Sequence, residues 1–216
     1  MKGIPRAFWL AIFVDLPFVF AAVLYPGLPE KVPMHFGADG RSDAWGGPGS
    51  IFLGPGIMGV VSVFMYALLT NIGGIDPKHR TSGEETAIKD LALFLTAFLS
   101  LLSLCMIAAT AWPGLPVIKL MLGSLGIGFF GMGRYFPKLR PNYFAGFRLP
   151  WTLEDPDNWA WTQLWAGRVW IRGGLCIILA ALLLDGTWLW AAFTILISVM
   201  VILPVLHSRR RYKSRA

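Results

Sequence analysis

Long blocks of apolar residues, separated by short polar connectors, run along most of this chain of 216 residues. A helix of about 20 apolar residues rises about 30 Å, which matches the hydrocarbon core of a bilayer. The pattern therefore predicts an all-α membrane protein with about six transmembrane helices. We expect them at about 8–25, 51–72, 87–112, 116–133, 169–184 and 188–206.

The connectors set the ends of these helices. The prolines of PGLPEKVP end the first helix, because a proline inside a helix removes a hydrogen bond and clashes with the preceding turn. The pair Asp185 and Gly186 is a minimal turn, which predicts that the last two helices are antiparallel neighbours. The fifth expected helix is short and begins near Arg168 and Arg172, whose long side chains can reach the membrane interface.

Composition supports the membrane class. The chain is 56% hydrophobic and 14% charged, whereas an ordinary soluble domain is about a quarter charged. A water-soluble fold would leave much of this apolar surface uncovered. Cys105 and Cys176 both fall inside apolar blocks, so we expect no disulfide framework.

The basic residues predict the orientation. Lys and Arg concentrate on the cytoplasmic side of membrane proteins, and an N-terminus inside places sixteen of the nineteen there. We therefore expect a multi-pass protein of the cytoplasmic membrane with both termini in the cytoplasm. The net charge of +7 and the C-terminal SRRRYKSRA then indicate membrane lipid as a partner, and no direct nucleic-acid binding. The basic residues expected inside are Lys2, Arg6, Lys78, Arg80, Lys89, Arg134, Lys138, Arg140, Arg148, Arg168, Arg172, Arg209, Arg210, Arg211, Lys213 and Arg215, and those outside are Lys31, Arg41 and Lys119.

Two polar stretches divide the chain into halves. We expect an N-terminal three-helix half over 1–112, with a patterned extracytoplasmic loop at 26–50. The second half covers 113–216 and contains a cytoplasmic stretch at 134–168 that is rich in tryptophan and arginine. Five of the ten tryptophans lie between Gly133 and Gly174, and tryptophan with arginine at this density is typical of a membrane–water interface.

The extracytoplasmic loop carries three side chains at intervals of four: His35, Asp39 and Asp43. On a helix they would form a metal-ligand face. Pro33 before them and Gly40 between them make a helix improbable there, so the pattern favours a turn over a metal site. The segment VPMHF is expected to be extended, and ADGR has the residues of a tight turn.

Asp15 is an acid inside the first expected helix, two residues before Pro17. A charged group at that depth usually faces a partner or water and marks a functional site. The alternative is a protonated or hydrogen-bonded acid that satisfies the backbone near the proline. Lys119 is the nearest candidate base, but it lies toward the opposite membrane face.

The fourth expected helix is rich in glycine, which allows close approach of a neighbouring helix. Packing is the favoured interpretation. The sequence contains no HExxH, nucleophile elbow, Walker loop or paired zinc-ligand motif. We therefore expect no enzyme, no catalytic residues, no cofactor and no bound metal.

In the second polar stretch, RPNYFAGFRLPWT has the residues of a held turn. The following LEDPDNWAWTQLWAG resembles a helix start, with Asp155 or Asp157 near its N-terminus. One interpretation is an amphipathic interfacial helix that only anchors the bundle. The other is a docking or ligand site at the cytoplasmic mouth.

The second stretch resembles the signature of the SdpI family of bacterial membrane proteins. The segment from Leu28 to Asp43 resembles the N-terminal domain of unknown function often found with it. The sequence departs from the family pattern at Gln163 and Leu164, where a His or Asn and a basic residue are frequent. The residues that carry the resemblance are Gly133, Pro137, Lys138, Asn142, Gly146, Arg148, Pro150, Trp151, Thr152, Leu153, Trp159, Thr162 and Gly167, with Leu28, Pro29, Val32, Pro33, His35, Phe36, Gly40 and Asp43 in the N-terminal segment.

The resemblance implies an immunity and signalling function. The best-known member of the family protects a bacterium from its own secreted killing peptide and holds a winged-helix repressor at the membrane. The implied partners are thus an antimicrobial peptide outside and a cytoplasmic repressor inside. The implied binding residues are Asn142, Gly146, Arg148, Pro150, Trp151, Thr152, Trp159 and Thr162, together with Pro33, His35, Gly40 and Asp43 of the outer loop.

Two other classes remain open. A membrane-embedded lipid-processing enzyme would use Asp15, His35 and Arg148, although the expected topology places His35 and Arg148 on opposite sides of the membrane. A small transporter or flippase is indicated by Asp15 and the glycine-rich fourth helix.

Overall fold

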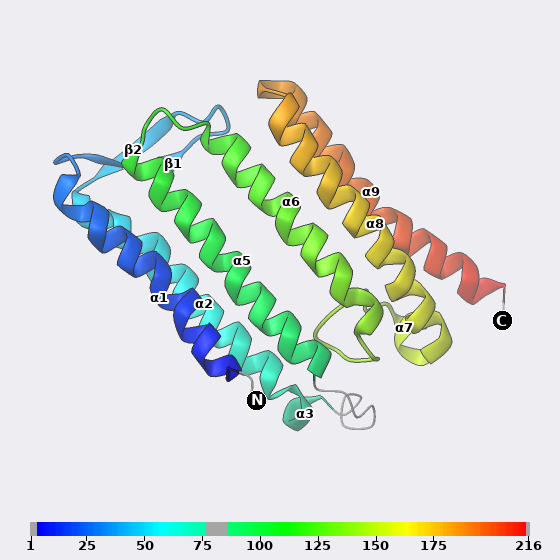
Figure 1. The fold of residues 1–216 in the computed structure, drawn as a ribbon. Coiled ribbons are helices and arrows are strands. Elements are labelled where there is room, and N and C mark those ends of the chain that lie inside the picture. Colours follow the sequence, from blue (N-terminus) through cyan, green and yellow to red (C-terminus); the bar gives the residue numbers. More distant parts are fainter. Residues whose placement is uncertain (1–3, 77–85, 215–216) are drawn as a thin grey trace. The chain divides into compact units, whose positions relative to one another are not determined.

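The computed structural model describes residues 4–76 and 86–214, so the expectations for Lys2, Lys78, Arg80 and Arg215 fall outside the described residues. The described chain is mostly helical and has six helices long and apolar enough to cross a membrane (Figure 1), as the apolar pattern predicts. These helices are α1 (Arg6–Leu24), α2 (Leu53–Thr70), α5 (Thr86–Ala111), α6 (Val117–Tyr135), α8 (Pro156–Leu183) and α9 (Gly186–Lys213).

Shorter elements connect them. A 3-10 turn follows α1 and another precedes α2, and a third ends α6, so each of these spans is extended by one tight turn. A proline begins or follows the start of each of the three turns, where its fixed backbone angle fits. The short elements are η1 (Tyr25–Gly27), η2 (Pro48–Phe52), η3 (Phe136–Lys138), α3 (Ile72–Ile75) and α7 (Pro150–Glu154).

The first four spans begin and end within about three residues of their expected positions, but the last two are longer than expected. Helix α8 starts at Pro156 and runs without a break through the tryptophan-rich segment to Leu183, so the expected interfacial helix is the first part of the fifth span. Helix α9 continues past 206 through the basic cluster to Lys213. Asp185 and the positive φ of Gly186 make the tight turn between them, and Figure 1 shows α8 and α9 running antiparallel along each other.

Hydropathy misplaced the start of α8 because its buried face is polar. Asn158, Trp159, Thr162 and Gln163 are all buried and recur at the helical spacing of three and four. The Asp155 carboxylate caps the helix by accepting from the backbone N–H groups two and three residues later, at 2.9 and 3.1 Å. The expected helix start at Asp155 is therefore confirmed.

A two-stranded antiparallel hairpin between α1 and α2 corrects the all-α expectation. Strand β1 (Val32–Phe36) pairs with β2 (Ser42–Gly46), with two irregularities of register around His35. Gly40 adopts a positive φ of 78° in the turn, a conformation that glycine takes without strain. The extended VPMHF segment and the tight turn at ADGR are both confirmed.

The described chain forms two compact units. One contains residues up to 67 and 93–124, with the hairpin, and the other contains 68–92 and the chain from 125 onward. In the second unit α6 packs closely on α8 through two pairs of glycines. A Cβ on Gly126 would lie 2.9 Å from the Gly174 carbonyl oxygen, and one on Gly133 would lie 2.8 Å from that of Gly167. Close packing, the favoured interpretation of this glycine-rich helix, is confirmed.

Candidate functional site

Asn142 is the centre of the loop that joins η3 to α7. Its side chain is fully buried. The amide oxygen accepts from the backbone N–H groups of Phe144 and Ala145, at 2.8 and 2.7 Å, and the amide nitrogen donates to the Arg140 carbonyl at 2.8 Å. One side chain thus replaces three backbone hydrogen bonds, which is how asparagine folds a turn.

Gly146 and Gln163 lock the next part of the loop. Gly146 has a φ of +93°, and a Cβ there would lie 2.7 Å from the Gln163 amide oxygen. Gln163 is fully buried and accepts from the Phe147 N–H at 3.1 Å, while its amide nitrogen donates to the Phe147 carbonyl at 3.2 Å. The side chain therefore pairs with one backbone unit in the manner of a neighbouring strand. The sequence marked this glutamine only as a departure from the family pattern.

The loop closes at the start of α7. The Thr152 hydroxyl accepts from the Leu149 N–H at 2.9 Å and lies 2.9 Å from the Phe147 carbonyl, to which it can donate. Pro150 stands at the first position of α7, where its missing N–H has no consequence. Arg148 is exposed, and its guanidinium donates to the Tyr143 carbonyl at 2.8 Å. Its charge is thereby held above the loop.

Three helices are joined below the loop by indole and amide donors. Trp159 is buried and donates to the Leu139 carbonyl at 2.8 Å. Trp151 on α7 donates to the hydroxyl of Ser208 on α9 at 2.7 Å. Asn158 on α8 also reaches the Ser208 carbonyl, at 3.4 Å, and the Thr162 hydroxyl lies 3.4 Å from the Asn158 amide oxygen. Sequence reasoning missed Asn158 and Ser208, which hydropathy does not distinguish from surface residues.

A further buried group connects this loop to the segment after α2. Asp76 is fully buried, and its carboxylate accepts from the Tyr143 N–H at 2.7 Å. Sequence reasoning missed it. A sequence signal was present, since an acid followed by proline directly after an apolar helix is typical of a specific turn.

Most of the expected signature residues therefore hold a loop. Asn142, Thr152, Trp159 and Thr162 are buried, and Gly146 is needed for its backbone conformation. The surface that these side chains support includes Tyr143 and Leu164, both more than 40% exposed, together with Arg148. Such a fixed surface with exposed aromatic, aliphatic and basic side chains can bind another molecule.

The hairpin of the other unit carries the expected outer-loop residues. His35 Nδ1 lies 2.6 Å from an Asp43 carboxylate oxygen across the two strands, and both side chains are largely exposed. Asp39 accepts from the Arg41 N–H at 3.0 Å and so belongs to the turn. Within the described residues, no three His, Cys, Asp or Glu side chains gather where they could hold a metal ion.

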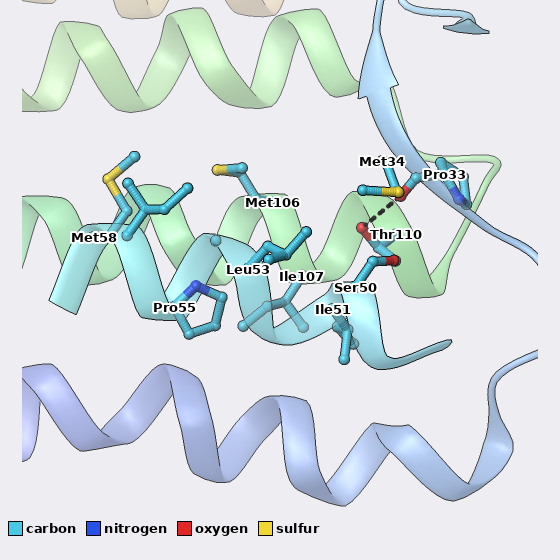
Figure 2. A pocket seen from close by; sticks show the side chains of 12 residues that line it. Pro33, Met34, Ser50, Ile51, Leu53, Pro55, Met58, Met106, Ile107 and Thr110 are labelled. Atoms are coloured by element: carbon cyan, nitrogen blue, oxygen red, sulfur yellow. Dashed lines mark hydrogen bonds between the residues drawn. The ribbon is translucent and has the colours of Figure 1, made fainter. Parts of the chain in front are cut away.

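A pocket of about 210 Å³ lies below the hairpin. Figure 2 shows Pro33 and Met34 of β1 at one end and Met58 at the other, with Met106 between them. The two hydroxyls of its wall are engaged, since Thr110 donates to the Pro33 carbonyl at 3.4 Å and Ser50 to the Gly47 carbonyl at 2.7 Å. The pocket wall can thus contact a ligand through apolar groups and polarizable methionine sulfur, and none of the described residues that line it is charged. The lining residues are Pro33, Met34, Ser50, Ile51, Leu53, Gly54, Pro55, Ile57, Met58, Met106, Ile107 and Thr110.

Asp15 lies on an exposed part of α1, and Pro17 two residues later is buried. Its position on the surface of the helix leaves it accessible to a partner, whereas the alternative of an acid bonded to its own backbone has no hydrogen bond to support it within the described residues. No contact joins Asp15 to His35 within the described residues, and His35 contacts Asp43 instead.

Comparisons with known proteins identify relatives of this chain. The model of the SdpI/YfhL protein family matches residues 138–208, and that of a domain of unknown function, DUF1648, matches residues 12–59. The immunity protein SdpI of Bacillus subtilis (strain 168) is 26% identical over 208 residues, which cover 94% of this chain and 93% of the relative. No solved structure matches. The chain is therefore a member of the SdpI/YfhL family with an N-terminal DUF1648 domain, and a distant homologue of an immunity protein.

Proposed function

We propose that this protein confers immunity. It binds an antimicrobial, killing peptide at the hairpin and so protects the cell that expresses the protein. The observation that carries this proposal is the similarity to the immunity protein of Bacillus subtilis along 94% of the chain. It covers both the hairpin region and the signature loop. The SdpI family is not known as an enzymatic family, and the proposal involves no catalysis.

The pocket below the hairpin supports a peptide as the ligand. A cavity of about 150 Å³ lined by aliphatic and aromatic residues holds a benzene ring, so about 210 Å³ suits one large apolar side chain. Methionine-lined surfaces adapt to different apolar partners. Beside the pocket, Met34 and Trp45 of the hairpin are 46% and 57% exposed. We infer that one apolar side chain of the peptide enters the pocket while the hairpin contacts its backbone.

Two glycines of α2 allow a matched test. Gly54 lines the pocket, and a Cβ there makes ordinary contact with Met106 at 3.4 Å, whereas a Cβ on Gly56 meets open space outside the pocket. Gly54→Leu therefore fills the pocket, and Gly56→Leu adds the same side chain elsewhere on the helix. The genes are expressed in a host that is sensitive to a killing peptide, and survival is scored at equal membrane abundance.

We expect the wild-type protein and Gly56→Leu to protect, and Gly54→Leu to lose most of the protection. Killing of the wild-type strain by every such peptide would refute the immunity function. Protection by Gly54→Leu equal to that by Gly56→Leu would refute the pocket as the binding site while leaving immunity intact.

We propose further that the signature loop faces the cytoplasm and recruits a repressor protein. The support for recruitment is the hydrogen-bonded framework of the loop, which presents three exposed side chains. They are Tyr143, which is 46% exposed, Arg148 and Leu164. A photo-crosslinking residue at position 164 is expected to capture a small DNA-binding protein only when the peptide is present. Cysteine labelling from outside intact cells should modify a cysteine at position 35 and not one at position 148. The reverse labelling pattern would contradict the proposed orientation.

A further inference from the structure

Four side chains form a stacked cluster where α8 begins and α9 ends. The rings of Trp165 and His207 lie parallel with centroids 4.2 Å apart, and Trp161 stacks in nearly the same orientation at 6.4 Å from Trp165. The guanidinium of Arg211 lies over the Trp161 ring at 5.0 Å. Arg211 follows His207 by four residues, so both project from the same face of α9. The cluster is independent of the hairpin and the signature loop.

Arg211 is incompletely satisfied in this position. Its Nε atom is buried and has no hydrogen-bond partner within the described part of the chain. Leaving a buried charged donor without an acceptor is costly, and native proteins rarely do so. A guanidinium is a planar fork of donors that matches the oxygens of a phosphate. Nε itself is enclosed, but the two terminal nitrogens of the same guanidinium are accessible and have no hydrogen-bond partner within the described residues, so they can take an anionic acceptor supplied by another molecule.

The lengths of the two helices place the cluster at the level of lipid headgroups. Trp161 precedes Leu183, the end of α8, by 22 residues, and Arg211 follows Gly186, the start of α9, by 25. At 1.5 Å per residue these spacings are about 33 and 38 Å, slightly more than the hydrocarbon thickness of about 30 Å. With the turn between the helices at one membrane surface, the cluster lies just beyond the hydrocarbon at the other.

We propose that the cluster is a binding site for the phosphate of an anionic phospholipid. Arg211 donates to the phosphate oxygens, and the faces of Trp161 and His207 form the walls beside it. The neighbouring Arg209 and Arg210 are exposed and attract anionic lipid without a fixed geometry. The site thus combines one oriented cation with a diffuse basic surface.

The full-length protein is tested in nanodiscs of phosphatidylcholine alone or mixed with phosphatidylglycerol, and native mass spectrometry counts the lipids it retains. Arg211→Gln and Arg210→Gln each remove one positive charge at adjacent positions. The first removes it from the cluster and the second from the exposed surface. Thermal unfolding in phosphatidylcholine confirms that each variant is folded. Arg211→Lys keeps the charge and loses the planar fork, so it separates geometry from charge.

We expect Arg211→Gln to lower phosphatidylglycerol retention about tenfold at both low and high salt. Arg210→Gln should lower it by less than about fivefold at low salt and not at all at high salt, because exposed charges are screened. Arg211→Lys should fall between the two. Equal effects of the two Gln variants at high salt would overturn the proposal. Displacement of the lipid by millimolar inorganic phosphate would also overturn it and would identify a free anion as the ligand. So would an Arg211→Gln variant that retains the lipid but no longer captures a cytoplasmic protein, which would identify a protein partner.

Discussion

Gly174 offers the sharpest test of the packing between α6 and α8. A Cβ at this position would lie 2.5 Å from the backbone nitrogen of Phe130 and 2.6 Å from the Gly126 carbonyl oxygen, and real Cβ atoms are essentially never found within 3.0 Å of such atoms. Gly174→Ala therefore forces the two helices apart by roughly 0.5 to 1 Å. A gap of that size forfeits a quarter to a half of each van der Waals contact across it.

The expected loss of stability is about 1 to 3 kcal/mol, the usual range for overpacking. In a chain of this size each kcal/mol lowers the melting temperature by roughly 2 to 4 °C. Gly56→Ala in α2 is the control, because its added methyl meets open space. Melting is followed by tryptophan emission in detergent. A melting temperature of Gly174→Ala equal to that of Gly56→Ala would refute the close approach of the helices.

Three further substitutions test the signature loop, two by the same melting assay and one by proteolysis. Gln163→Leu leaves the backbone N–H and carbonyl of Phe147 without their partners. Each unpaired group costs about 1 to 3 kcal/mol, and water restores part of this, so the expected loss of stability is about 2 to 4 kcal/mol. Ser208→Ala should cost about 1 kcal/mol through its bond with the indole of α7, whereas Ser198→Ala, exposed on the same helix, should change stability by less than about 0.5. Asn142→Ala should release the loop and increase its proteolysis; unchanged cleavage would contradict its role.

The apolar pattern predicted the six spans because each apolar block is long enough to cross a bilayer by itself, and no tertiary information is needed for that. The hairpin turn was also predictable, since Gly40 and Asp39 specify it locally. The extent of α8 was not. Its first turns bury Asn158 and Gln163, and only the hydrogen bonds of those side chains to distant backbone explain why they lie inside.

The site divides in the same way. Signature residues could be identified from their resemblance to a family, but their roles depend on partners up to 57 residues away, as between Trp151 and Ser208. Ser208 and Arg211 looked like parts of one basic tail. In the structure Ser208 is buried and accepts from an indole, while Arg211 lies over a tryptophan ring. Local composition cannot separate such neighbours, because burial is decided by how α9 rotates against α8.

The side chains that fold the signature loop bond to its backbone and not to its side chains. Asn142, Thr152 and Gln163 reach carbonyl and N–H groups that every amino acid possesses. Positions 144 and 145 contribute only their N–H groups to these bonds, which any residue except proline can supply. The exposed side chains of the loop can therefore change, and with them what the loop recognises, while the hydrogen-bonded backbone keeps the same conformation.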